Sequence, residues 1–161
     1  MRRKDREVTD LEQIENILKP IKTCRLAMVD KGQPYVIPLS HGYAIDGDKL
    51  ILYFHSAKEG RKIDVLKENS AVCFEISTEG EASFGGDAAC SYGYYFSSVI
   101  GFGNAEFVED IEEKCKALSM ITQHQSGRSH EFTEKQADLI CIFKVTSSDF
   151  TGKLKPKPAH S

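Results

Sequence analysis

The chain lacks the features of membrane-spanning and nucleic-acid-binding proteins. None of its apolar runs approaches the ~20 residues that a membrane-spanning helix needs. Its formal net charge is −3, so no overall positive field attracts it to nucleic acid or to an anionic membrane. The N-terminal "MRRKDREVTD" contains basic residues, but no apolar stretch follows them as in a secretory signal. We therefore expect neither nucleic acid nor a membrane as partner, and a cytoplasmic location.

The sequence also lacks the patterns of a disulfide framework or a zinc site. Its 5 cysteines are an odd number at wide spacings, and no C-x-x-C pair occurs. Apolar, strand-like runs contain Cys24, Cys73 and Cys141, and a thiol in such a run usually acts as a small buried hydrophobic group. His124 and His130 are separated by a polar loop, a poor spacing for metal ligands. We expect no metal site.

Two common nucleotide-binding motifs are absent. The chain has no G-x-G-x-x-G and no strict alternation of strands and helices, which argues against a Rossmann fold. It has no G-x-x-x-x-G-K-[ST] either, which removes the common triphosphate-binding loop. Any anion that this protein binds must therefore be held by a local cluster of donors.

The strand-like segments predict a mainly β protein. With 161 residues, 40% of them hydrophobic, the chain is long enough for one domain, residues 1–161, and too short for two of ordinary size. Its strand-like runs are 23–30, 34–45, 49–55, 71–77, 92–109 and 137–147, with a Gly- and Ser-rich loop at 78–89. Turn residues separate these runs, which is typical of antiparallel connections. The pattern favours a β-barrel with peripheral helices.

Three segments have the apolar periodicity of amphipathic helices. They are residues 10–19, 56–69 and 110–124. Each opens with an acceptor side chain followed three positions later by glutamate, the pattern of a capping box. The pairs are Thr9 with Glu12, Ser56 with Glu59 and Asp110 with Glu113. The tail at about 151–161 is basic and contains proline, so we expect it to be flexible unless it docks.

The stretch "FHSAKEGRK", residues 54–62, gathers donors where a strand changes into a helix. A helix that begins near Ser56 leaves its first backbone N–H groups without intrahelical partners, and its dipole places partial positive charge there. Arg61 and Lys62 add two cations, and Ser56 adds a hydroxyl. Together they fit a mononucleotide phosphate. A solvated basic helix start is the alternative, because such starts are common.

Several blocks resemble one known family. "LYFHSAKEGRKIDVLKENSAVCFEIS" resembles the flavin-binding segment of pyridoxamine 5′-phosphate oxidase-related split barrels, and more narrowly of the branch that includes the nitroimidazole-resistance (Nim) reductases. The blocks "CRLAMVDKGQPYVIPLSHGY" and "CSYGYYFSSVIGFGNAEFVEDIEEKCKALSMITQH" resemble it too. The resemblance runs in order from about Leu11 to Val145.

The resemblance implies a six-stranded antiparallel split barrel with flavin mononucleotide (FMN) at a homodimer interface. The residues that it assigns to FMN are Ser56, Arg61 and Lys62 at the phosphate, His55 and Ala57 beside it, main-chain groups of Pro38, Leu39 and Ser40 at the isoalloxazine ring, and Ser98 and Val99 on the long strand. The last two could come from the partner subunit.

Three further residues are candidates for a small-molecule substrate pocket. His41 lies in "PLSHGY" beside the proposed ring contacts, and Tyr92 stands where relatives often have Trp. His124 ends the helix predicted at 110–124. For both histidines a structural role is the alternative, because a helix C-terminus favours a cation and a strand histidine is often part of the core.

The resemblance implies an FMN-dependent oxidoreductase that passes electrons from NAD(P)H or another donor to a small acceptor, such as a nitro compound. No side chain stands out as acid, base or nucleophile, so we assign no catalytic residue; the flavin would carry the redox chemistry. The alternative is a sensor, store or carrier that binds flavin, or haem in the same cleft, without turnover. For haem, the candidate axial ligands are His41, His124 or a tail histidine.

Overall fold

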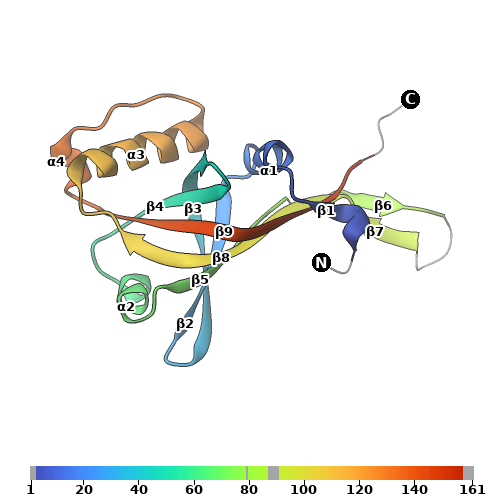
Figure 1. Cartoon of the computed structure of the whole chain (residues 1–161), viewed down its shortest axis with the longest axis horizontal. Helices are drawn as coiled ribbons and strands as arrows, with labels where there is room; N and C mark the ends of the chain where they lie inside the picture. Colours follow the sequence, from blue (N-terminus) through green and yellow to red (C-terminus); the bar gives the residue numbers. More distant parts are fainter. Residues whose placement is uncertain (1–2, 79, 87–90, 158–161) are drawn as a thin grey trace.

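Six long strands form a closed antiparallel ring in the computed structural model, which describes residues 3–78, 80–86 and 91–157. They are β2 (Thr23–Asp30), β3 (Gln33–Asp46), β4 (Lys49–Ser56), β5 (Ala71–Ser77), β8 (Phe96–Phe107) and β9 (Cys141–Lys155). Their order is β9-β4-β3-β2-β5-β8, and pairing of β8 with β9 closes the ring (Figure 1). The predicted six-stranded antiparallel barrel is confirmed.

The helices lie outside this ring (Figure 1). They are α1 (Leu11–Leu18), α2 (Arg61–Glu68), α3 (Ile111–Ser126) and α4 (Glu134–Ala137), with a 3-10 turn at Lys4–Arg6. A short strand, β1 (Glu7–Val8), pairs with β9. α3 packs across β3 so closely that a Cβ on Gly42 would lie 2.7 Å from the backbone nitrogen of Ile121. Glycine at this position therefore lets α3 rest directly on the barrel wall.

Alternate side chains of each strand fill the barrel. Along β4, Leu50, Leu52 and Phe54 are fully buried, whereas the residues between them are partly exposed. Phe54 stacks on Phe143 of β9 with ring centroids 5.1 Å apart. Burial of one such side chain is worth about 1.5–3 kcal/mol. A slip of one residue would turn this set outward, so burial fixes the strand register.

A hairpin occupies part of the segment that we predicted as a loop. β6 (Ala82–Phe84) pairs with β7 (Tyr92–Tyr94), and Tyr95 interrupts the strand between β7 and β8. The hairpin projects beyond the barrel (Figure 1). Phe84, Tyr92 and Tyr94 are all exposed, and the buried position of β6 is Ser83, so no apolar alternation predicts β6; β7 lies within the predicted strand-like run 92–109.

Two predicted helix starts are wrong. Ser56 is the last residue of β4, paired with Cys141, so it cannot also cap a helix. α2 instead begins at Arg61, after Gly60, whose φ of 128° suits only glycine. α1 is capped by Asp10, which accepts from the Gln13 N–H, and not by Thr9 with Glu12.

The third predicted cap and the tail agree better with the structure. Asp110 accepts from the backbone N–H of Glu113 and caps α3, as predicted. The tail docks: β9 continues to Lys155, which pairs with Phe96, and Gly152 pairs with Val8 of β1. Because this end of β9 pairs with β1 on one edge and with β8 on the other, most of the basic tail forms a strand where we expected flexibility. Residues 158–161 lie outside the described part.

Candidate functional site

β3 and β4 separate at one end of the barrel. Their last paired residues are His41 and Phe54. Beyond this point residues 33–40 of β3 pair only with β2, and His55 and Ser56 of β4 pair only with β9, among the residues described. One edge of β3 is therefore free of a neighbouring strand over Pro38, Leu39 and Ser40. An open edge offers backbone N–H and C=O groups to a ligand.

The chain leaves β4 at a corner that we call the β4–α2 corner, residues 56–62. The Ser56 hydroxyl is buried and has no hydrogen-bond partner in the described part of the structure. Leaving such a group unsatisfied costs about 1–3 kcal/mol. A buried orphan hydroxyl therefore points to a missing polar partner at this corner.

The start of α2 adds further donors to the β4–α2 corner. Its N-cap, Gly60, has no side chain, and the described residues give the helix no side-chain cap. The N–H groups of Ile63 and Asp64 bond to the Gly60 carbonyl, so those of Arg61 and Lys62 precede the first intrahelical bonds. Arg61 is exposed and Lys62 is half-buried. The corner thus combines free N–H groups, two cations and an orphan hydroxyl, a donor set that suits phosphate.

Of the residues predicted beside the phosphate, His55 is the last but one residue of β4 and is exposed, and Ala57 opens the exposed loop to α2. The prediction placed the helix N–H groups at Ala57 to Glu59, four residues too early. The cations at Arg61 and Lys62 nevertheless stand at the true helix start. The predicted donors therefore stay within residues 56–62, but Ser56 ends a strand and the helix begins at Arg61.

Ser98 and Val99 lie away from this corner. They belong to β8, which stands opposite β3 in the ring, three strands away in either direction. Three strand spacings are about 14 Å. The Val99 side chain is fully buried, so it has only backbone groups to offer a ligand. Within one chain, the structure does not bring these residues to the open edge of β3.

His41 and His124 do come together. Their ring centroids lie 4.7 Å apart under α3, and the Nε2 atom of His124 is 2.8 Å from the Ile21 carbonyl oxygen. His41 is fully buried, and neither ring nitrogen has a partner among the described residues. Burial, followed by the charges of His124 and Lys22, lowers the pKa of His41 to about 3. Burial also lowers the pKa of His124. Both rings are therefore neutral at pH 7.

A cavity of about 540 Å³ adjoins His124 on the outside of the barrel. Tyr43, whose ring meets the His124 ring edge-on at 5.1 Å, lines it together with Lys22 and Met120. His41 does not line this cavity. Tyr92 lies on the β6–β7 hairpin against Phe84, at the end of the molecule away from α3 (Figure 1). The three predicted pocket residues thus do not form one pocket in a single chain.

Sequence reasoning missed two residues that contact Arg61. The Arg61 Nε atom lies 2.8 Å from Asp30 Oδ2, and its guanidinium carbon lies 4.3 Å from the centre of the Tyr35 ring. Neither contact has a periodic signal, because the partners are separated by 31 and 26 positions. The described ranges contain no cluster of His, Cys, Asp and Glu that could hold a metal ion, and no helix long and apolar enough to cross a membrane.

A ring of six antiparallel strands that opens between β3 and β4 defines a split-barrel protein. A family model described as pyridoxamine 5'-phosphate oxidase matches residues 10–154. The chain therefore belongs to the pyridoxamine 5'-phosphate oxidase family. Curated protein sequences give no match.

Solved structures show the same architecture. A candidate 5-nitroimidazole antibiotic resistance protein from Bacteroides thetaiotaomicron is 32% identical, with a TM-score of 0.79, over 91% of this chain and 85% of that one. The flavocytochrome Anf3 from Azotobacter vinelandii is 20% identical, with a TM-score of 0.78, over 100% and 74%. An FAD and heme binding protein from Mycobacterium smegmatis is 16% identical, with a TM-score of 0.77, over 97% and 77%. The first confirms the predicted resemblance; the other two support the fold alone.

Proposed function

We propose that this protein is a homodimeric FMN-dependent oxidoreductase. The observation that carries the proposal is the β4–α2 corner, where the buried orphan hydroxyl of Ser56 stands four residues before the uncapped start of α2 with its two cations. The corner follows the strand end at which β3 and β4 part, so a ligand held there by its phosphate would extend along the open edge of β3. FMN has this form, a phosphate joined by a short chain to a flat ring.

The ring would lie against the backbone of Pro38, Leu39 and Ser40. When bound, FMN would supply hydride and electron transfer, while the protein provides binding, orientation and electrostatics. We assign no side chain as acid, base or nucleophile. His55 and Ala57 would border the phosphate, and Ser98 and Val99 would reach the ring from a second copy, because in one chain they stand on the opposite wall.

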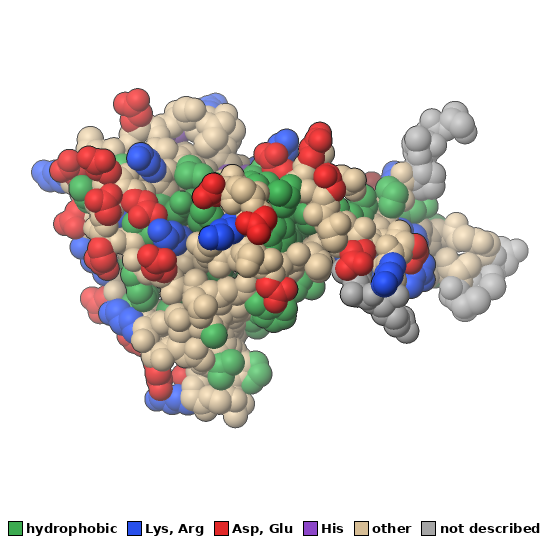
Figure 2. Space-filling view, viewed as in Figure 1, with side chains coloured by type: hydrophobic (Ala, Val, Ile, Leu, Met, Phe, Trp, Pro, Cys, Tyr) green, Lys and Arg blue, Asp and Glu red, His purple; other side chains and the backbone are tan. Residues whose placement is uncertain are grey.

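A homodimer is supported by an apolar face of the barrel. The cross-strand row Val36, Ala27, Cys73 and Phe102 runs over β3, β2, β5 and β8. The side chains at its two ends are each 56% exposed, and Ile100 in the next row is 44% exposed. Figure 2 shows hydrophobic side chains at the surface beside β8 and near the tip of the β2–β3 hairpin. Contiguous exposed apolar patches of this kind mark interaction surfaces.

Electrons would come from NAD(P)H or another donor and pass to a small acceptor such as a nitroimidazole. The similarity to the Bacteroides thetaiotaomicron protein supports this class of acceptor. His124 and Tyr92 remain the proposed substrate contacts, with Tyr92 supplied by the hairpin of either copy; His41, which is fully buried, would act only through its contact with His124. A cytoplasmic location stays a prediction.

Haem in the same cleft has less support. His41 is fully enclosed, and the His124 ring nitrogen Nε2 already contacts the Ile21 carbonyl oxygen, so neither His41 nor the Nε2 atom of His124 is open to a haem iron. The tail histidine lies outside the described residues. A flavin carrier without turnover remains the other reading of the same site.

The visible spectrum of the purified full chain tests this proposal. We expect a flavin spectrum that bleaches on anaerobic addition of NADH or NADPH and recovers when a nitroimidazole is added. Denaturation should release FMN and not FAD, as resolved by chromatography. A Soret band, or a bound flavin that no donor reduces, would contradict the oxidoreductase assignment.

A further inference from the structure

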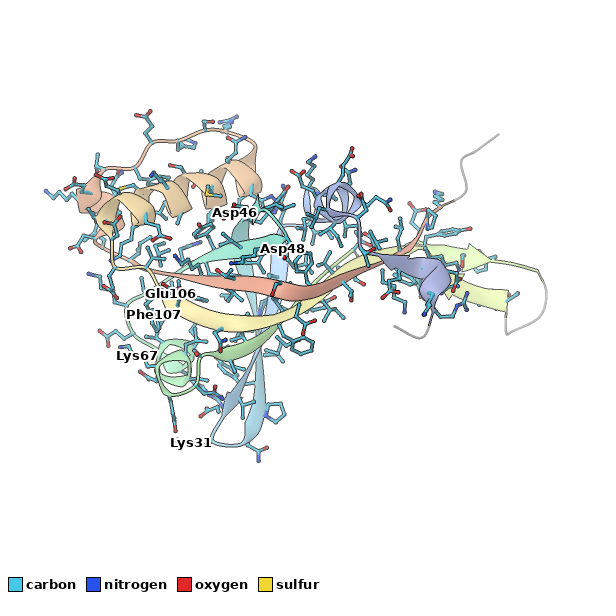
Figure 3. All side chains as sticks on the ribbon, viewed as in Figure 1. Lys31, Asp46, Asp48, Lys67, Glu106 and Phe107 are labelled. Carbon is cyan, nitrogen blue, oxygen red and sulfur yellow. The ribbon has the colours of Figure 1, made fainter. Side chains whose placement is uncertain are left out.

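The β2–β3 hairpin holds two side chains against the start of α2. Its two-residue turn, Lys31–Gly32, has positive φ at both positions, 50° and 81°, as the tight hairpin turn of this type requires. Asp30 and Tyr35 lie on the same face of the hairpin as the buried Met28, because Met28 pairs with Tyr35 and Asp30 lies two residues further on. Figure 3 shows Lys31 at the tip of this hairpin, near α2.

Arg61 is fixed at two points by this hairpin. Its Nε donates to Asp30 Oδ2 at 2.8 Å, and its guanidinium carbon lies 4.3 Å from the centre of the Tyr35 ring. The Arg61 side chain is nevertheless 62% exposed, whereas that of Asp30 is only 17% exposed. Only Nε is used: within the described residues, the two Nη groups of Arg61 have no hydrogen-bond partner.

These contacts of Arg61 add little to the stability of the fold. An ion pair with an exposed partner contributes little to folding, since the side chain loses rotamer freedom and water screens the charges. The same contacts do restrict the rotamers of the Arg61 side chain before any ligand binds, so less rotamer freedom is lost on binding. Stacking on Tyr35 sets the plane of the guanidinium, and the bond to Asp30 sets its rotation in that plane. The two Nη groups then form a fork that fits two phosphate oxygens.

We propose that Asp30 and Tyr35 are positioning residues that orient Arg61 for the phosphate of the flavin and so give the site its preference for FMN over riboflavin. This inference rests on the proposed function. Neither residue touches the phosphate itself; both act through Arg61. Asp30 would compete with the phosphate for Arg61 if it occupied the two Nη groups of the guanidinium. Asp30 contacts Nε instead, which leaves both Nη groups to the phosphate.

The test compares FMN with riboflavin, which lacks the phosphate. Flavin is stripped from the full chain, and both ligands are titrated by calorimetry into wild-type protein and into the variants Asp30→Asn, Tyr35→Leu and Arg61→Ala. We expect Asp30→Asn and Tyr35→Leu each to lower the affinity for FMN by roughly 10-fold, because one charge-assisted contact of Arg61 becomes weaker. Riboflavin affinity should not change. Asp30→Asn in an Arg61→Ala background should cause no further loss.

A matched control is Asp46→Asn, at the end of β3 before the β3–β4 turn, far from Lys31 (Figure 3). It should leave both affinities unchanged, and thermal unfolding should show that all variants fold. Tighter FMN binding by Asp30→Asn would overturn the proposal in favour of competition. Equal weakening of FMN and riboflavin would overturn it in favour of a purely structural role. An Arg61→Ala variant that binds FMN normally would instead contradict the proposed function.

Discussion

The rings of His41 and His124 lie 4.7 Å apart and tilted by 50°, with no proton donor bound to either nitrogen of His41 in the described structure. His41 is in β3, one residue after the open edge, and His124 is in α3. Gln125 strengthens the link, since its side-chain amide donates to the carbonyl oxygens of both His41 and Lys22. The contact therefore ties α3 to the strand that borders the proposed flavin site.

This burial predicts acid sensitivity. Because the pKa of His41 falls to about 3 in the folded protein from an ordinary value of 6.5, the unfolded state binds the proton more readily. Stability from this group is present above pH 6.5 and is lost as the pH falls toward 3, by up to about 1.4 kcal/mol per pH unit. Denaturant unfolding at pH 7, 6 and 5 should show a shallower pH dependence in His41→Leu than in wild type.

The control for that experiment is His130→Gln, which changes an exposed histidine in the loop after α3. Its pH dependence should match that of wild type. If His41→Leu and wild-type protein lose stability in parallel between pH 7 and 5, His41 is not held neutral by its surroundings.

Ser56→Ala should separate folding from binding. Removing a buried hydroxyl that lacks a partner should leave the flavin-free protein as stable as wild type, or more stable by up to about 1 kcal/mol. Affinity for FMN should fall, because the hydroxyl is a proposed phosphate contact. Denaturant unfolding and FMN titration measure the two effects.

Ser147→Ala is the matched comparison, since Ser147 is also buried and its hydroxyl donates to the Phe102 carbonyl oxygen at 2.6 Å. This variant should lose about 1 kcal/mol of stability and keep its FMN affinity. Similar destabilisation by both substitutions would argue against an unsatisfied hydroxyl at Ser56.

Phe102→Glu should convert the proposed dimer into a monomer. The side chain ends the exposed apolar row over β2, β3, β5 and β8, and a charge there would have to be desolvated in the interface. Light scattering coupled to size-exclusion chromatography would measure the mass. Leu139→Glu, at an exposed leucine beside α4, is the control and should leave the dimer intact. A monomeric wild-type protein would refute the interface at once.

The barrel was predictable because turn residues separate its strand-like runs. β4 could be predicted as a strand from its apolar run 50–54, but its buried face could not, because Ile51 and Tyr53 are apolar or aromatic like the buried Leu50, Leu52 and Phe54. The start of α2 was predicted wrongly, because Ser56 and Glu59 match a capping box although Ser56 pairs with β9 in the structure. Gly60, with its positive φ, was the better signal. β6 was not predicted, because its buried position is Ser83 and its apolar Phe84 is exposed, whereas β7 lies within the predicted run 92–109.

The candidate site was predictable only in part. Ser56, Arg61 and Lys62 are close in the sequence, and a local pattern can reveal such a cluster. The opening between β3 and β4 depends on where a strand ladder stops, and the contact between Arg61 and Asp30 joins positions 31 residues apart. Composition and periodicity contain no information on either. The pairing of His41 with His124 likewise appears only in three dimensions.

The most direct test of the account is equilibrium FMN binding by wild-type protein and by the double variant Arg61→Ala/Lys62→Ala. Exposed lysines away from the β4–α2 corner supply the control, Lys4→Ala/Lys49→Ala, which also removes two positive charges. Lys49 is at the other end of β4 from Ser56, and Lys4 precedes β1, which pairs with the end of β9 opposite to the one that pairs with Ser56. Charge-assisted contacts are worth about 1.5–3 kcal/mol each, so the first double variant should lose about 100-fold or more in affinity while keeping its melting temperature. The control should bind FMN as wild type does. Undiminished FMN binding by Arg61→Ala/Lys62→Ala would contradict the assignment of the phosphate to this corner.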